Sequence, residues 1–309
     1  MAHITAGDLL PIIQWNENTY GTPTGDPKYY GDVAEGGGFT PTDTLNPYIS
    51  WRYGDRSYDP ANYVNQQLDA GFQASLEVRD VAGWTDILKY ALGGTTSAPA
   101  TSPYGALPSR TEAFFIRKAS GSHDGRRYKG CKTDSLTVKC DQPGGIVRFE
   151  ETVLASSAVG FSSVPSGTAW DPAGAAVQWT GGTKIGSTTI YPQSFSLTIS
   201  NGLERVHYPG SVTGVLGSPA YTGAIIEGRR EITLEMELWL EDLTYFDQSV
   251  SATATAATTV QLTLGAANPY KLNVTGIVMR EGQHDALIQD KQRQTVRLRC
   301  TEATMAAVA

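Results

Sequence analysis

The sequence has few cysteines and no long apolar run. Its three cysteines, Cys131, Cys140 and Cys300, form no CxxC pair, and no histidine stands at metal-ligand spacing from them. We therefore expect reduced packing residues and folding in a reducing compartment. No apolar stretch approaches the about 18 residues that span a membrane, and residues 1–30 lack the apolar core of a signal peptide. We expect no membrane partner.

Motifs of catalysis and of cofactor binding are also missing. Two His–Asp dipeptides occur, at 123–124 and 284–285, but no GxSxG nucleophile motif accompanies them. The run at 181–184 (GGTK) lacks the spacing of a phosphate-binding loop, and no zinc, calcium or dinucleotide motif is present. We therefore predict a protein that is not an enzyme, with no catalytic residue, no metal site and no cofactor.

Positive charge is scarce as well. The chain has 24 Lys and Arg against 31 Asp and Glu, which gives a net charge of −7. Because a firm hold on nucleic acid needs clustered cations, the chain is a poor candidate for binding DNA tightly. Its apolar fraction of 40% and charged fraction of 18% are nevertheless those of a folded protein.

Short alternating runs of apolar and polar residues dominate what is present, and they predict a mainly β fold. The clearest run covers 231–240, and similar runs cover 72–80 and 195–199. Helical spacing of apolar residues predicts a short helix at 84–91 and a second at 242–249. Further strands are predicted at 112–118, 133–140, 146–154, 177–180, 185–191, 259–264, 270–279 and 294–301.

The order of these elements repeats along the chain. Each half has a Gly/Pro-rich loop, a long amphipathic strand, a short helix, and then three strands. The segment 75–78 (SLEV) corresponds to 233–236 (TLEM) at an offset of 158 residues, and 147–149 (VRF) corresponds to 296–298 (VRL) at 149. We predict two similar β-sandwich domains, 1–165 and 166–309. The alternative is one large sandwich with coincidental similarity.

Residues 16–63 are rich in proline, glycine and tyrosine. Prolines at this density exclude a regular helix and a central strand, while the aromatic content is too high for a solvated loop. We predict an irregular loop that becomes ordered against a neighbouring chain. Stacking on sugar rings is the alternative role for the same aromatic residues. The candidate contact residues are Tyr29, Tyr30, Tyr48, Trp51, Tyr53 and Tyr58.

An acidic stripe follows the strand at 231–241. Glu231, Glu235 and Glu237 share one face, because side chains on a strand point alternately to opposite sides. A solvated sheet face would explain this pattern. The functional alternative is a wall that lines a passage for a polyanion, since carboxylates repel phosphates and offer no cation to bind them.

Three segments resemble the tail tube (major tail) proteins of long-tailed viruses with non-contractile tails. They are 128–138 (YKGCKTDSLTV), 193–204 (QSFSLTISNGLE) and 226–235 (IEGRREITLE). The resemblance implies a β-sandwich flanked by a short helix. It also implies that the sheets of neighbouring subunits join into a β-barrel ring of six domains round a lumen. With two domains per chain, three chains would complete a ring, and stacked rings would form the tube that delivers DNA into the host.

The resemblance also implies partners and a location. The partners are further copies of this chain and the tail terminator, tape measure and tail tip proteins, while genomic DNA passes through the lumen without specific binding. The location is the virion tail, after assembly in the host cytoplasm. The alternatives are a carbohydrate- or receptor-binding β-sandwich of a virion, another virion component such as a tail terminator or capsid protein, and a hydrolase, which the missing nucleophile motif disfavours.

Overall fold

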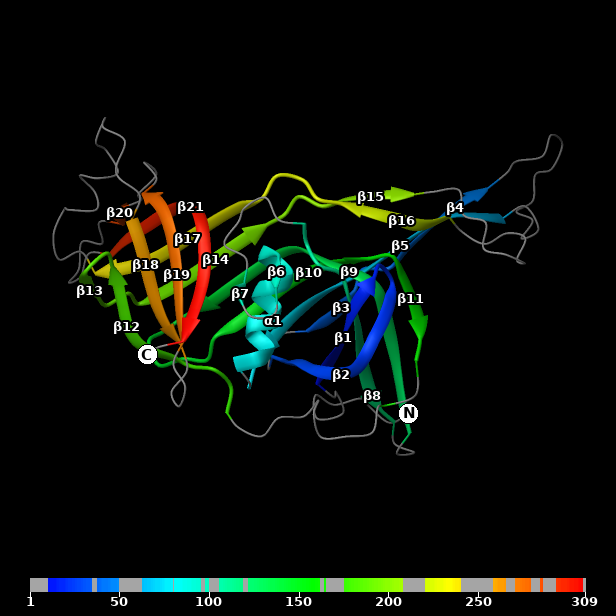
Figure 1. Cartoon of the computed structure of the whole chain (residues 1–309), viewed down its shortest axis with the longest axis horizontal. Coiled ribbons are helices and arrows are strands. Elements are labelled where there is room, and N and C mark those ends of the chain that lie inside the picture. Colours follow the sequence, from blue (N-terminus) through cyan, green and yellow to red (C-terminus); the bar gives the residue numbers. More distant parts are fainter. Residues whose placement is uncertain are drawn as a thin grey trace.

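The protein is mainly β in the computed structural model, with one helix and one parallel strand pairing among the described residues. The molecule is elongated, and strands from both halves of the chain run along its length (Figure 1). The described residues are 11–34, 38–49, 63–79, 81–95, 98–99, 106–118, 122–161, 164, 175–207, 220–239, 258–264, 270–278, 284–285 and 293–307.

A six-stranded antiparallel sheet, here called the central sheet, unites the two halves. In spatial order its strands are β5 (Tyr63–Glu77), β10 (Arg148–Ala155), β9 (His123–Cys140), β14 (Ser194–Ser200), β17 (Glu231–Trp239) and β21 (Arg293–Ala307). One row of paired residues crosses all six strands, and every side chain in it is fully buried. The row is Leu76, Phe149, Val138, Leu197, Leu234 and Leu298. At about 1.5–3 kcal/mol for each buried side chain, this apolar face holds the halves together.

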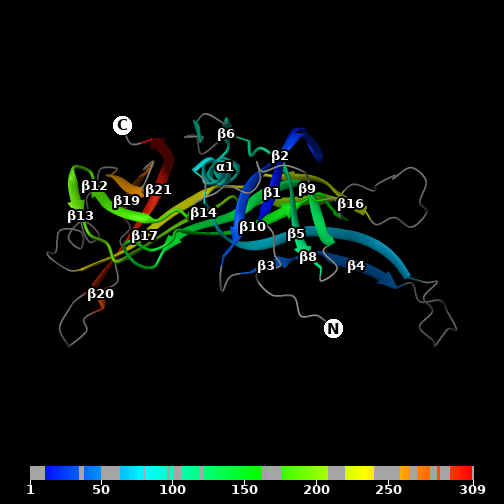
Figure 2. The ribbon, with the colours of Figure 1, turned by 90° about the horizontal axis from the view of Figure 1, so that it is seen from below.

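The N-terminal half covers the apolar face with a second layer of strands and with the helix. Beyond β9 the pairing continues through β8 (Arg110–Arg117) and β1 (Ile12–Thr19) to β2 (Thr22–Val33), while β11 (Ser157–Gly160) pairs with the other edge of β9. Figure 2 shows α1 on one side of the central sheet.

The helix α1 (Val81–Leu92) confirms the helix predicted at 84–91. Ile87, Leu88 and Ala91 are buried in the core, as their helical spacing requires. The helix ends at Gly93, whose positive φ of 83° and whose amide bond to the Lys89 carbonyl at 2.7 Å are typical of a glycine C-cap. The second predicted helix, at 242–249, lies outside the described residues.

The C-terminal half extends the sheet from β21 and adds no described helix. In spatial order the strands are β19 (Tyr270–Val278), β18 (Thr258–Leu264), β12 (Trp179–Ile185) and β13 (Thr188–Ile190), and β20 (His284–Asp285) pairs with the start of β21. Their alternating apolar residues pack into the same core as those of the N-terminal half.

A strand arm projects from one end of the molecule (Figure 1). In the arm, β4 (Thr44–Ile49) pairs with the start of β5, and β15 (Glu204–His207) pairs with β16 (Ala220–Ile226). The two hairpins meet through the parallel pairing of β16 with β5. Beside the arm, β3 (Phe39–Pro41) pairs with β5, and the short β6 (Gly94–Thr95) and β7 (Ala98–Pro99) pair with each other.

The two halves share one pattern of strand pairings. The single strand β5 corresponds to two strands of the C-terminal half, with β16 in the place of its start and β17 in the place of its end. With that correspondence, the pairings β1–β2, β1–β8, β8–β9, β9–β10, β10–β5, β5–β3 and β5–β4 have as counterparts β12–β13, β12–β18, β18–β19, β19–β21, β21–β17, β17–β14 and β16–β15. The register also agrees, because Leu76 pairs with Phe149 and Leu234 pairs with Leu298. The offset of 158 residues relates Leu76 to Leu234, and the offset of 149 residues relates Phe149 to Leu298. The two sequence matches therefore lie on equivalent residue pairs of the two halves.

The prediction of an irregular loop at 16–63 is wrong for its described residues, which form β1 to β4. Three of the prolines lie at irregularities of the strand pairing, and Pro41 is the last residue of β3. Pro27 lies between two successive pairings of β1 with β2 that differ in register, Pro23 borders a second such shift, and Pro47 lies at a register shift between β4 and β5. A high density of prolines therefore argues against a regular strand pairing, but it is compatible with a pairing that contains bulges.

Candidate functional site

The face of the central sheet opposite the buried row, here called the polar face, is the candidate surface that spans both halves of the chain. Its side chains are half-buried or exposed. The two halves meet on it through Thr137 and Thr198, whose hydroxyls are 3.4 Å apart. Most of its uncharged residues carry hydroxyl groups. They include Ser75, Ser135, Thr137, Thr152, Ser196, Thr198, Ser200 and Thr233.

The acidic stripe lies on this polar face. Glu231, Glu235 and Glu237 alternate along β17 with Ile232, Leu234, Met236 and Leu238, all of which are at most 5% exposed. The predicted separation of the two faces of this strand is therefore confirmed. That the glutamates face a lumen stays a prediction.

Sequence reasoning missed the cations that lie beside these glutamates. On the neighbouring strand β21, Arg297 pairs with Glu235, and Arg299 lies 3.2 Å from Glu231. Ser194 also donates to Glu237 at 3.5 Å. The expectation of a bare carboxylate wall is thus wrong, since guanidinium groups from the adjacent strand partner the stripe. The alternation of 296–299 (VRLR) carries the signal that could have revealed them.

The same pairing of charges extends across the polar face into the N-terminal half. Lys139 on β9 lies 2.7 Å from Glu150 on β10, and Arg148 lies 3.5 Å from Glu77 on β5. Among the side chains that the structure describes on this face, five carboxylates and four cations take part in these contacts. The carboxylates are Glu77, Glu150, Glu231, Glu235 and Glu237, and the cations are Lys139, Arg148, Arg297 and Arg299.

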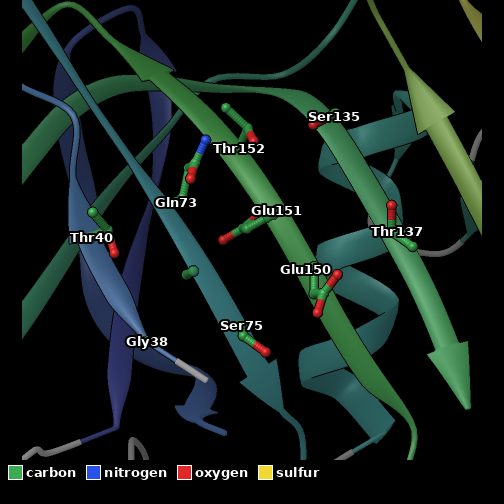
Figure 3. Close-up of a pocket in the computed structure, with 10 residues that line it drawn as sticks. Gly38, Thr40, Gln73, Ser75, Ser135, Thr137, Glu150, Glu151 and Thr152 are labelled. Carbon is green, nitrogen blue, oxygen red and sulfur yellow. The ribbon is translucent and has the colours of Figure 1, made fainter. Parts of the chain in front are cut away.

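A shallow hollow of about 370 Å³ lies in the polar face between β3 and β9 (Figure 3). Short polar side chains from β5, β10 and β9 rise into it, and α1 lies behind the sheet (Figure 3). The lining has no aromatic ring on which a sugar could stack. It comprises Gly38, Thr40, Gln73, Ala74, Ser75, Ser135, Thr137, Glu150, Glu151 and Thr152.

Two of the predicted inter-subunit tyrosines lie in the protein core. Tyr29 is 4% exposed and donates to Asp32 at 2.8 Å, and Tyr30 is fully buried and donates to Glu151 at 2.9 Å. Their assignment to a contact with a neighbouring chain is wrong, because β2 turns both rings into the fold. The side chains of Tyr48, Trp51, Tyr53 and Tyr58 lie outside the described residues.

A buried polar cluster, here called the Arg110 cluster, is formed by side chains of β2, β8, β9 and β10. The Arg110 guanidinium contacts Glu112, Thr133 at 2.8 Å and Glu151 at 3.0 Å, and it stacks on the Tyr30 ring at 5.0 Å. Burial raises the pKa of Glu112 to about 8, with a further contribution from the nearby Glu151 carboxylate, although Arg110 opposes the shift. The cluster is enclosed by the core, so its chemistry is structural.

Sequence reasoning missed this cluster too, although one signal was available. Glu151 falls at an inward position of β10, between the buried residues Phe149 and Val153. A charged residue at a core position of an alternating strand predicts a buried partner.

Metal and membrane features can be assessed only for the described residues. Within them no group of three or more His, Cys, Asp or Glu could hold a metal ion. In the same part of the chain, no helix is long and apolar enough to cross a membrane. All three cysteines are buried and free of disulfides, as expected from the sequence.

A wide antiparallel sheet with one apolar, covered face and one charge-paired polar face is the architecture of a layered, mainly β protein. The family model for phage tail tube proteins matches residues 16–304, so the chain belongs to the phage tail tube protein family. It is a structural component of the virion tail that assembles with itself and with other tail proteins, in a family that is not normally enzymatic. No curated protein matches the chain.

Proposed function

We propose that the chain builds the wall of the tail tube as two tandem modules, 1–165 and 166–309, so that three copies complete each ring. The observation that carries this proposal is the shared set of seven strand pairings, together with the matching register of Leu76–Phe149 and Leu234–Leu298. Two modules that repeat one topology can occupy two equivalent places round a ring. Three chains then give the six places that the family resemblance implies.

In this arrangement the polar face lines the lumen. The apolar face is already covered by the chain's own second layer and by α1, so the polar face is the broad sheet surface left to border a channel. Its cations are engaged by carboxylates, as in the pairs Arg297–Glu235 and Lys139–Glu150. Paired cations displace few counterions from DNA, so the genome can move past without specific binding.

The outer parts of the molecule then serve contacts along the tube. Rings stack through a heterologous contact that repeats without limit, and the side chains of Tyr48, Trp51, Tyr53 and Tyr58 remain candidates for contacts with a neighbouring chain. By family resemblance the tail is non-contractile, the tube assembles in the host cytoplasm, and the tail terminator, tape measure and tail tip proteins are the partners. A sugar-binding role is disfavoured, because Tyr29 and Tyr30 are buried.

Electron microscopy of the concentrated, purified chain tests this function. We expect tubes or rings with threefold symmetry and a pseudo-sixfold wall, and cross-linked rings should have the mass of three chains. Rings of six chains would contradict the two-module stoichiometry. A stable monomer that never assembles would contradict the tube itself.

A further inference from the structure

Asn201 and Gly202, directly after β14, form the single Asn–Gly dipeptide of the chain. Glycine has no Cβ, so its amide nitrogen can approach the preceding side chain with little hindrance. In a flexible chain this nitrogen attacks the side-chain amide carbon of the asparagine, which then loses ammonia. The sequence therefore contains one dipeptide that is especially prone to deamidation.

The fold holds the side chain of Asn201 from three directions. Its Nδ2 donates to the Ala91 carbonyl at the end of α1, at 3.0 Å, and to the Thr133 carbonyl on β9, at 2.9 Å. Its Oδ1 accepts from Arg230 Nε at 2.7 Å, and the residue is only 1% exposed. Because these partners come from both halves of the chain, the side chain can turn only where the contact between the halves opens.

The backbone beside the side chain is fixed as well. The Asn201 amide donates to the Asp134 carbonyl at 2.7 Å, and the Leu203 amide donates to the Asp134 carboxylate at 2.8 Å. A Cβ added at Gly228 would lie 2.3 Å from the Gly202 carbonyl oxygen, so the two glycine backbones are in close contact. The Gly202 nitrogen therefore has no room to turn toward the side chain of Asn201 while this contact is closed.

We propose that Asn201 is a latent modification site, which deamidates when the contact between the two halves opens and is protected while it is closed. The Gly202 nitrogen gives its proton to water and bonds to Cγ of Asn201. The Cγ–Nδ2 bond breaks, and Nδ2 takes up a proton and leaves as ammonia. Water, the sole co-reactant, then opens the cyclic imide at either carbonyl, which gives an aspartate or an isoaspartate.

The product would not fit the closed contact. A carboxylate at position 201 cannot donate to the carbonyls of Ala91 and Thr133, so both would lose this buried hydrogen bond. An isoaspartate would also lengthen the backbone beside Gly228, where the chain is already in close contact. The reaction would thus mark chains that have stayed open for long and keep them from closing again.

Peptide mass spectrometry of the wild-type chain, incubated folded and in urea at one mildly alkaline pH, tests the protection. Position 201 should deamidate in urea and react roughly 100-fold or more slowly in the folded chain, because three hydrogen bonds must break first. Asn273 is the internal reference, since the branched side chain of Val274 hinders the attack, and it should change little in either state. Equal rates at position 201 in the folded and unfolded chain would overturn the proposal.

A matched pair of variants tests whether the contact between the halves gives the protection. Arg230→Ala removes the bond to Oδ1 and should speed deamidation of the folded chain by about tenfold to 100-fold. Arg229→Ala, at the exposed neighbouring position, should leave the rate unchanged. In urea both variants should react at the wild-type rate. An unchanged or slower reaction in folded Arg230→Ala would contradict the protective role.

A second pair of variants tests the consequence of the reaction. After dilution from urea, Asn201→Asp should be depleted from the folded fraction in size-exclusion chromatography. Asn273→Asp should refold like the wild type, because an aspartate there still accepts the 2.9 Å bond from Gln261. Refolding of Asn201→Asp in the wild-type yield would refute this consequence. None of these measurements requires tubes, so their outcome is separate from that of the proposed function.

Discussion

Replacing Glu231 and Glu235 by glutamine should turn the proposed lumenal wall into one that retains DNA. The substitutions keep the size of both side chains and leave the apolar face of β17 untouched. They remove the carboxylate partners of Arg299 and Arg297. Both ion pairs are 38–56% exposed, so each contributes about 0–1 kcal/mol to stability. A total loss below about 2 kcal/mol should leave folding and assembly intact.

The expected effect on DNA follows from the loss of the two carboxylates beside Arg297 and Arg299. Each chain would lose two carboxylates that lie beside guanidinium groups on the polar face, and each contact of a guanidinium with a phosphate contributes roughly −0.9 to the slope of log K against log salt. Two such contacts give a slope of about −1.8. A twofold rise in salt should therefore weaken the hold of one chain on DNA by roughly 3.5-fold.

The rate of DNA release from particles with variant tubes measures this effect. Release should be slowed at low salt and restored as salt rises. Asp124→Asn is the matched control, because it removes an exposed ion pair with Lys118, 3.1 Å long, on the β8–β9 hairpin away from the polar face. Double-glutamine particles that assemble and release DNA at the wild-type rate at low salt would refute the lumenal assignment.

Three further substitutions probe the fold by urea denaturation. Since burial raises the pKa of Glu112 from 4.5 to about 8, the folded state holds a proton that the unfolded state has lost between these pH values. The free energy of unfolding should therefore fall as the pH rises across that window, by at most about 1.4 kcal/mol per pH unit. Glu112→Gln should flatten this dependence, and Glu150→Gln, on the polar face, should preserve it; equal profiles for wild type and Glu112→Gln would contradict the assignment. Arg230→Ala should cost about 1.5–3 kcal/mol by removing its 2.6 Å bond to the carbonyl at the end of α1, unlike Arg229→Ala at an exposed position. Leu234→Ala should cost about 2–5 kcal/mol, as expected for a fully buried leucine.

The local sequence was enough to predict a strand or helix wherever the two faces of that element follow from its own consecutive residues. The alternation in β17 and the apolar spacing in α1 are properties of consecutive residues, so both elements were predicted closely. The strands β1 to β4 were missed, because the bulges that accommodate their prolines depend on the register with a partner strand. The Arg297–Glu235 pair was missed for a related reason, since 62 residues separate the two strand positions and only the pairing of β17 with β21 brings them together.

The two halves are also joined by contacts away from the pairing of β9 with β14. These contacts would stiffen the proposed tube wall. The C-terminal end of α1, in the N-terminal half, is capped by two side chains from the C-terminal half. Asn201 donates to the Ala91 carbonyl at 3.0 Å, and Arg230 donates to the Leu92 carbonyl at 2.6 Å. Arg230 also donates to Asn201 at 2.7 Å, so the two caps support each other. Rocking of one half against the other would break these bonds as well as the β9–β14 ladder. In the proposed ring of three chains, each covalently linked pair of modules would supply one junction already formed, so that assembly would have to create only half of the junctions.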